Sequence, residues 1–323
     1  MNKRRYFLRK VANALLTIVL VASFNFALFR ILPGDPARLL LPKGQWSAEE
    51  IARQKANFHL DRPLYQQFGY YWLDTIQLKF GDSFKQQRSV TAVVWERIPP
   101  TLLLVGTGTV VAMIVGLLSG IYAGWRREGI FDTVSTTVGM VFYSTPTLWI
   151  GMILIMIFSV KLGWFPVGRM SDPGADLSGA WEHIQSITSH LVLPALTFAL
   201  VYIGQYQIIM RTSVSSVMNE DFVLTARAKG LSSGQVLWKH AVPNALLPTV
   251  TVIMMNLGFV MSGAILTETV FNWPGIGLLS YESMLNLDYP VMQAVFLLAS
   301  VAVIVMNLIA DVMYYRLDPR VQS

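Results

Sequence analysis

The sequence contains no cysteine and only four histidines among its 323 residues. The lack of cysteine excludes a disulfide framework, a thiolate metal site and a cysteine nucleophile. The histidines, at positions 59, 183, 190 and 240, lack the spacing of a metal site and give metal catalysis little support. The phosphate-binding pattern Gly-x-x-x-x-Gly-Lys-Ser/Thr is also absent. If ATP drives this protein, another chain must therefore bind it.

Charged residues are scarce as well. They make up 14% of the chain, compared with about a quarter in soluble domains, while 54% of the residues are hydrophobic. This composition predicts an all-α polytopic membrane protein embedded in a lipid bilayer. The net charge of +6 comes from basic residues beside apolar runs, which indicates membrane topology. The sequence has no DNA-binding motif, so we expect no nucleic-acid partner.

Six apolar runs have roughly the twenty residues that a helix needs to cross the hydrocarbon core. We place the predicted transmembrane helices at 11–32, 101–125, 133–160, 190–210, 247–270 and 290–314. The first run competes with a cleaved signal peptide, but it is too long for one and no convincing cleavage site follows. We therefore expect a retained first span. Pro146 predicts a kink in the third.

The distribution of basic residues predicts the orientation of these spans. Short loops on the side of the N-terminus carry most of the Lys and Arg residues, which places both termini and the loop 211–247 in the cytoplasm. The expected organisation has four parts. They are an N-terminal cytoplasmic segment with the first span (1–32), an external region (33–98), a five-helix core containing the cytoplasmic loop (99–314) and a cytoplasmic tail (315–323).

The most informative stretch is the polar segment 219–248, which lies between the fourth and fifth predicted spans. Asn219 or Asp221 is expected to cap a helix that continues through Lys229, because a short side-chain oxygen can accept from the free amides of the first turn. Gly230 is expected to end this helix, because glycine readily adopts the left-handed conformation common at helix C-termini. The segment therefore predicts a helix followed by a glycine corner.

A second short helix is predicted after the corner. Ser232 and Gln235 form a capping-box pattern, so the helix should begin there and continue towards His240 until Pro243 ends it. Leu224, Ala228 and Leu231 are predicted to share one apolar face. Three basic residues favour the positive, aqueous side of the membrane: Arg227, Lys229 and Lys239.

This segment resembles the "EAA" loop of binding-protein-dependent ABC importer permeases. The similarity rests on Ala226-Arg227-Ala228-Lys229-Gly230, followed after nine residues by His240-Ala241-Val242-Pro243, with glycine and proline at the family spacing. The glutamate that names the motif is missing, and Leu224 or Thr225 stands near its place. A salt bridge through that glutamate is therefore not expected. The Ala-Arg-Ala-Lys-Gly version is similar to the dipeptide, oligopeptide and nickel branch.

Other phrases extend this resemblance over nearly the whole chain. They include Leu162-Gly163-Trp164-Phe165-Pro166, Phe271-Asn272-Trp273-Pro274-Gly275-Ile276-Gly277 and the tail sequence Leu317-Asp318-Pro319-Arg320. The resemblance implies a type I ABC importer permease fold in a bacterial plasma (inner) membrane, forming half of a translocation pathway. Expected partners are a homologous second permease, two ATPase subunits and a periplasmic or lipid-anchored solute-binding protein.

The resemblance also implies where coupling takes place. The loop that docks on the ATPase would be formed by Ala226, Arg227, Ala228, Lys229, Gly230, Ser232, His240 and Pro243. The partner ATPases would use the ATP, and this chain would bind no cofactor and catalyse no reaction. Dipeptides, oligopeptides, nickel, glutathione and oligosaccharides remain open as substrates, because selectivity in such importers lies largely in the binding protein.

Polar side chains inside predicted spans are costly and therefore functional candidates. Gln205, Asn256 and Glu268 could line the pathway, or they could form hydrogen bonds between helices. A channel or secondary transporter that needs no ATPase is the alternative function. An intramembrane serine hydrolase is a further alternative, with Ser119 or Ser262 as nucleophile and His190 as base.

Overall fold

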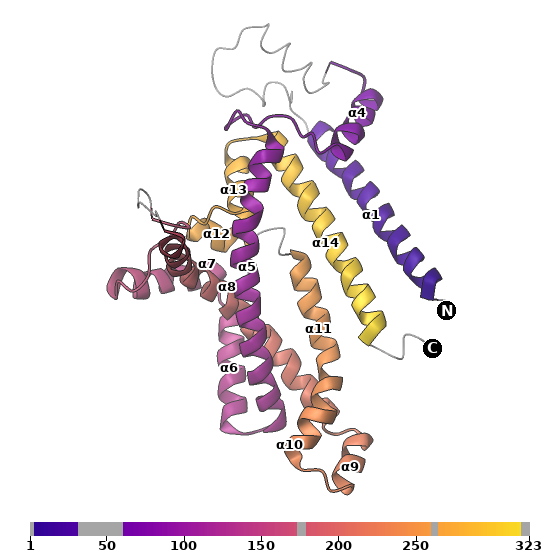
Figure 1. The fold of residues 1–323 in the computed structure, drawn as a ribbon, viewed down its shortest axis with the longest axis vertical. Helices are drawn as coiled ribbons and strands as arrows, with labels where there is room; N and C mark the ends of the chain where they lie inside the picture. The colour runs from indigo at the N-terminus through magenta and orange to yellow at the C-terminus, as the bar shows by residue number, and fades with distance from the viewer. Residues whose placement is uncertain (1–2, 32–60, 173–178, 260–263, 318–323) are drawn as a thin grey trace.

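The computed structural model describes residues 3–31, 61–172, 179–259 and 264–317. Residues 33–60 of the predicted external region, Ser262 and residues 318–323 of the tail lie outside these ranges. Within them every regular element is helical, which confirms the all-α class (Figure 1). The elements are α1 (Lys3–Ile31), α4 (Leu64–Ile76), α5 (Val90–Trp125), α6 (Ile130–Ser144), α7 (Thr147–Leu154), the π-helical η1 (Ile155–Lys161), α8 (Ala180–Val217), α9 (Asp221–Ala228), α10 (Ser233–Val236), the π-helical η2 (Leu237–Ala241), α11 (Val242–Phe259), α12 (Ile265–Val270), α13 (Ile276–Leu285) and α14 (Tyr289–Leu317).

Four described helices are long and apolar enough to cross a membrane: α1, α5, α8 and α14. A fifth candidate is the pair formed by α6 and the continuous α7–η1 segment. The two members of this pair meet at an angle of 103°, at the position where Pro146 follows α6. The predicted kink is therefore present, and the chain turns there through more than a right angle.

The fifth predicted span is not one continuous described helix. α11 ends at Phe259, and the chain resumes after the gap with the short α12, which begins at Ile265. The structure therefore supports four or five crossings by length and composition, and the full count of six remains a prediction.

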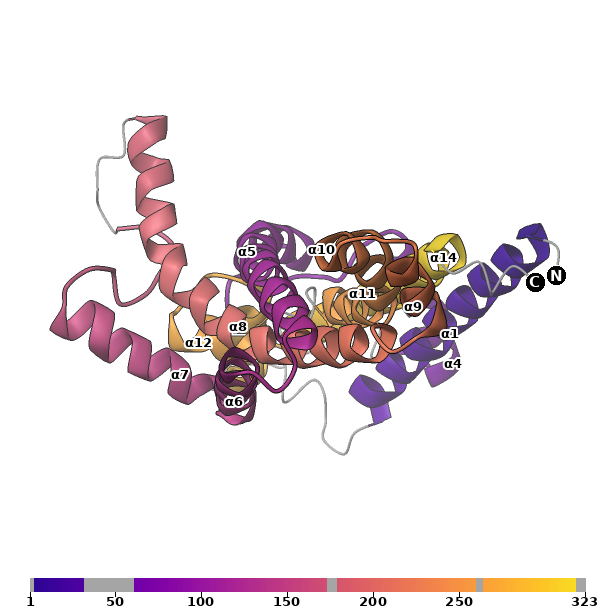
Figure 2. The same ribbon diagram turned by 90° about the horizontal axis from the view of Figure 1, so that it is seen from below.

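Two spans begin earlier than the sequence predicts. α5 already starts at Val90 and contains Pro99 and Pro100, while α8 starts at Ala180 and contains Pro194. Figure 2 shows the first turns of α8 directed away from the rest of the bundle, as expected for a helix that bends near a proline. Charged residues interrupt the apolar pattern before Pro99, so the predicted span starts only after it. The first turns of α5 nevertheless have an apolar face opposite these charges.

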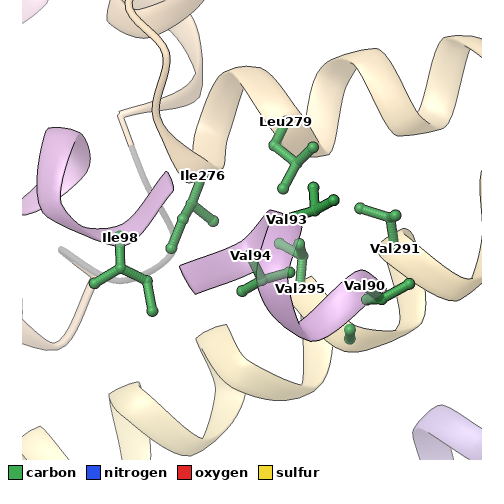
Figure 3. Close-up of a cluster of buried hydrophobic side chains, with 9 residues drawn as sticks. Val90, Val93, Val94, Ile98, Ile276, Leu279, Val291 and Val295 are labelled. Carbon is green, nitrogen blue, oxygen red and sulfur yellow. The ribbon is translucent and has the colours of Figure 1, made fainter. Parts of the chain in front are cut away.

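That apolar face forms the core at one end of the molecule. Side chains from the start of α5 pack against α13 and the start of α14 (Figure 3). The buried residues of this cluster are Val90, Val93, Val94, Ile98, Ile276, Leu279, Val291, Ala294 and Val295. The packing fixes the first turns of α5 beside the segment that contains α12 and α13.

Glycines bring the central helices into close contact. At Gly120 of α5, a Cβ atom would lie 2.6 Å from the carbonyl oxygen of Gln207 in α8. At Gly204 of α8, it would lie 2.1 Å from the carbonyl oxygen of Gly139 in α6. Such short distances leave no room for any side chain. α5, α6 and α8 are therefore joined backbone to backbone near the middle of the molecule.

Candidate functional site

The candidate site is the elbow, which we define as residues 221–241 and which comprises α9, the corner after it, α10 and η2. It connects the end of α8 to the start of α11. Figure 1 shows α9 and α10 at the lower end of the molecule, beyond the connection between α5 and α6. The elbow therefore lies at the opposite end from α4 and α13.

The corner of the elbow has the predicted conformation. Gly230 has a φ of +82°, in the left-handed region that favours glycine. Its N–H donates to the carbonyl oxygen of Arg227 at 2.9 Å, and the N–H of Leu231 donates to that of Ala226 at 3.4 Å. These bonds close the end of α9, whose last helical residue is Ala228. A Cβ atom at Gly230 would meet no neighbour within 4 Å, so the requirement for glycine is conformational.

The start of α9 differs from the prediction. The residue that caps α9 is Glu220, and its side chain makes no capping hydrogen bond. Asp221 is instead the first residue inside the helix, and the side-chain amide of Asn219 donates back to the carbonyl oxygen of Ser215 at 3.0 Å. The prediction placed the cap wrongly because the side chain of Asn219 forms its hydrogen bond with the last turn of α8. The carboxylate of Asp221 still lies in the first turn of α9, where it complements the helix dipole.

The second helix starts with the predicted capping box. The N–H of Gln235 donates to Ser232 Oγ at 3.4 Å, and the N–H of Ser232 donates to Gln235 Oε1 at 3.0 Å. This reciprocal pair satisfies two amides that would otherwise lack partners at the start of α10. The corner and the capping box together fix the direction in which α10 leaves α9.

Pro243 does not end the second helix, contrary to the prediction. α10 continues through η2 directly into α11, and Pro243 is the second residue of α11. A proline cannot donate a backbone hydrogen bond, and a π-helical turn such as η2 changes the bonding register just before it. The side-chain amide of Asn244 also donates to the carbonyl oxygen of His240 at 2.7 Å. α10, η2 and α11 therefore form one uninterrupted helical segment.

The buried face of α9 also differs from the prediction. Val223 and Ala226 point inward and pack with Val236 of α10, whereas Leu224 is 58% exposed and Ala228 is exposed as well. Helical spacing alone allowed either face to be buried. The choice depends on α10, which the glycine corner returns against the Val223 side. Leu231, the third residue of the predicted face, is partly buried against this small cluster.

The elbow is anchored to the ends of the long helices by buried apolar side chains. Leu237 and Ala241 of η2 pack against Ile121 of α5 and against Met210 and Val214 of α8. Leu237 and Ala241 are almost completely buried. Because side chains in such a cluster are close-packed, a displacement of η2 must also displace the ends of α5 and α8.

The outward face of the elbow is both apolar and basic. Trp238 is 55% exposed and, together with Leu224, leaves a large apolar area facing away from the bundle. Three basic side chains lie on the exposed side of the same segment: Arg227, Lys229 and Lys239. Ser232 and Pro243 are also exposed, while His240 is half-buried. Exposed apolar groups with charged neighbours are typical of a protein–protein contact surface.

The three polar residues predicted inside spans do not form one group. Asn256 of α11 donates through Nδ2 to Gln205 Oε1 at 3.0 Å and to the hydroxyl oxygen of Tyr206 at 3.2 Å. This small network joins α11 to α8. Glu268 lies elsewhere, in α12, with no exposed surface.

Glu268 holds the segment that follows it. Its Oε1 accepts from the hydroxyl of Thr101 at 2.9 Å, and its Oε2 accepts from the N–H of Leu278 at 2.9 Å. The Thr101 hydroxyl oxygen in turn accepts from the N–H of Ile276 at 2.7 Å. One carboxylate therefore connects α5, α12 and α13. Sequence reasoning missed Thr101 because a lone threonine in an apolar run carries no signal of such a partner.

A second polar contact missed by the sequence joins α6 to α8. Asp132 is buried at the start of α6 and accepts two hydrogen bonds from the guanidinium of Arg211, one of them from Nη2 at 2.7 Å. The N–H of Glu128 donates to the same carboxylate at 3.0 Å. Paired charges of this kind are costly to separate, so the contact holds the ends of α6 and α8 together.

The geometry argues against a serine hydrolase. The hydroxyl of Ser119 donates to carbonyl oxygens of its own helix, those of Val115 and Gly116, at 2.7 and 3.1 Å. The ring of His190 contacts the carbonyl oxygen of Ser186 instead. Within the described ranges, no group of three or more His, Asp or Glu side chains could hold a metal ion.

Comparison with known proteins identifies related sequences over almost the full chain. Residues 116–323 match the family described as the binding-protein-dependent transport system inner membrane component, and residues 3–105 match the N-terminal family of the same membrane components. The glutathione transport system permease protein GsiC of Escherichia coli (strain K12) is 37% identical over 318 residues, which cover 98% of each chain. The proteins of the same name from Shigella dysenteriae and Shigella flexneri show the same identity and coverage.

Proposed function

Because the chain belongs to the family of binding-protein-dependent inner-membrane permeases of ABC importers, we propose that its elbow is the part that receives mechanical work from an ATPase. The family is one of transport permeases, so neither the hydrolase nor a channel that works without an ATPase describes this chain. In such systems the ATP is used by partner ATPase subunits. The residues that carry coupling are the ones given above for the loop: Ala226, Arg227, Ala228, Lys229, Gly230, Ser232, His240 and Pro243.

The continuous helical path from the elbow into the bundle is the observation that carries this proposal. α10, η2 and α11 follow one another without a break, and Leu237 is buried against α5 and α8. A force applied to the exposed face of the elbow is therefore transmitted to α5, α8 and α11 together. Rigid-body movement of packed helices is a common way to convert a local displacement into a change of access.

The assembly follows from the same role. ABC importer permeases work with a partner permease, an ATPase and a solute-binding protein. We propose that the complex contains a homologous second permease, two ATPase subunits and a periplasmic or lipid-anchored binding protein. Each permease supplies half of the pathway, and each elbow contacts one ATPase.

The elbow and both termini are proposed to lie on the cytoplasmic side of a bacterial inner membrane. The excess of basic residues in the loops on that side supports this orientation. Lys10 near the start of α1 forms an ion pair with Asp311 towards the end of α14, with a nitrogen–oxygen distance of 2.8 Å. The N-terminal part of α1 and the C-terminal part of α14 therefore lie at the same level.

The proposed substrates are short peptides, including glutathione. The support is the 37% identity over nearly the whole length to a glutathione transport system permease. Gln205 and Asn256 are proposed to line the pathway, because they place amide groups at the contact of α8 and α11. Glu268 is proposed to act indirectly, by holding α12 and α13 against α5.

Cross-linking tests the contact between the elbow and the ATPase. The chain has no native cysteine, so Ser233→Cys places one thiol on the exposed start of α10, and Lys85→Cys provides a matched control at the opposite end. A thiol reagent that carries a photoactivated group, attached to the assembled importer and then irradiated, should join the Ser233→Cys permease to the ATPase and leave the Lys85→Cys permease unjoined. The proposal fails if the Ser233→Cys thiol reacts fully with a small reagent yet forms no cross-link.

A further inference from the structure

A second site lies away from the elbow, in a pocket of about 340 Å³ beside the end of α12. One wall is the loop that contains Gly168 and Arg169, another is the side of α8 at His190, and the third is the turn at Phe271 and Asn272. The N–H of Arg169 donates to the carbonyl oxygen of Phe271 at 2.7 Å. A Cβ atom at Gly168 would lie 2.4 Å from the same oxygen, so the loop is held tightly against the turn.

The hydrogen bonds of His190 define which of its ring nitrogens carries a proton. Its side chain is 3% exposed, and Nδ1 lies 2.8 Å from the carbonyl oxygen of Ser186. A carbonyl oxygen can only accept, so Nδ1 must be the protonated nitrogen that donates to it. In the neutral ring, Nε2 then carries a lone pair and can only accept a hydrogen bond.

The group that faces this lone pair is another acceptor. Asp172 Oδ1 lies 3.6 Å from His190 Nε2, and both residues line the pocket. The second oxygen of the carboxylate accepts a weak hydrogen bond from the hydroxyl of Ser186 at 3.4 Å. Asp172 is 61% exposed, so its carboxylate can be reached by a solute. When the ring is neutral, Nε2 and the carboxylate are two acceptors side by side, which leaves a place for a cationic donor.

We propose that this pocket binds the free ammonium group of the transported solute, which donates to both Asp172 and His190. The inference rests on the proposed peptide substrates and names the part of the peptide that the permease recognises. An ammonium group carries three N–H donors and a positive charge, so it satisfies both acceptors and the carboxylate charge together. In the predicted orientation, the pocket opens on the external side, where solute arrives from the binding protein.

Substitution of either acceptor tests the recognition. Asp172→Asn removes the charge at constant size, and His190→Asn keeps an amide donor for the Ser186 carbonyl while deleting the Nε2 acceptor. Asp82→Asn removes an exposed carboxylate outside the pocket and serves as the control. The assembled importer in proteoliposomes is loaded with binding protein, and uptake of glutathione and trialanine is compared with uptake of their N-acetylated forms.

The expected result is a change in selectivity. The ratio of free-amine to N-acetyl uptake should fall about tenfold or more in both pocket variants, because hydrogen bonds to charged groups are among the strongest. Asp82→Asn should keep the wild-type ratio. The binding protein is the same in every sample. Any preference it has between free-amine and N-acetylated solutes therefore cancels when the uptake ratios of the variants are compared.

Three outcomes would overturn the inference. Parallel loss of both forms at a constant ratio would mean that Asp172 and His190 only hold the loop in place. Unchanged uptake of both forms would mean that the pocket is not on the route. If the wild-type importer hydrolyses ATP but carries none of the probes, the proposed substrate class fails and this inference fails with it.

Discussion

Replacement of Gly230 tests whether the left-handed corner of the elbow is needed to transmit work. Its φ of +82° is disfavoured for any residue with a Cβ atom, at a cost of ~1–2 kcal/mol. A cost of this size changes the population of the native corner about 5- to 30-fold. Because a Cβ atom at this position would have no neighbour within 4 Å, alanine should show this backbone cost without any steric clash. Valine should show a larger effect, because its branched side chain restricts the backbone further.

The assay is the number of solute molecules imported per ATP hydrolysed by the reconstituted importer. Gly230→Ala and Gly230→Val should lower this ratio in that order, while the amount of permease in the membrane stays constant. Gly230→Asn is the matched control, because asparagine tolerates the left-handed region better than alanine and should recover part of the coupling despite its larger size. The reasoning is refuted if Gly230→Asn is as damaging as Gly230→Val, or if Gly230→Val couples normally.

Four further substitutions test the elbow and the core. Leu237→Ala should lower the thermal unfolding midpoint and weaken coupling, because truncation of a buried leucine costs about 2–5 kcal/mol. Trp238→Ala removes an exposed side chain, so it should leave the midpoint unchanged and weaken only the ATPase contact. Thr101→Val should destabilise the protein by about 1–3 kcal/mol, measured by thermal unfolding, because Glu268 loses a donor. Gly120→Val should prevent α5 and α8 from approaching, and normal expression and uptake of this variant would contradict the close contact.

The local features of the elbow were predictable because they depend on neighbouring residues. Gly230 and the pair formed by Ser232 and Gln235 are decided within a few positions of the chain, and the structure confirms both. The all-α membrane class was equally accessible, because the long apolar runs of α1 and α14 are contiguous in the sequence. The resemblance to the family rested on several short sequence motifs whose order and spacing match those of the permeases.

The predictions that were wrong concern features that are set by residues distant in the sequence. Leu224 is exposed because α10 returns on the other side of α9, and helical spacing carries no information about that return. Pro243 continues a helix because η2 precedes it, and no residue type signals a π-helical turn. The extent of the bend at Pro146 is likewise set by packing, since a proline predicts a kink but not its angle.

The sidedness of the elbow tests the central claim most directly. With no native cysteine in the chain, a thiol at Ser233→Cys can be labelled by a membrane-impermeant reagent without background. The account predicts labelling in inside-out vesicles and none in intact cells, with the reverse pattern for Lys85→Cys. Labelling of Ser233→Cys from outside intact cells would place the elbow beyond the reach of a cytoplasmic ATPase and contradict the proposed coupling.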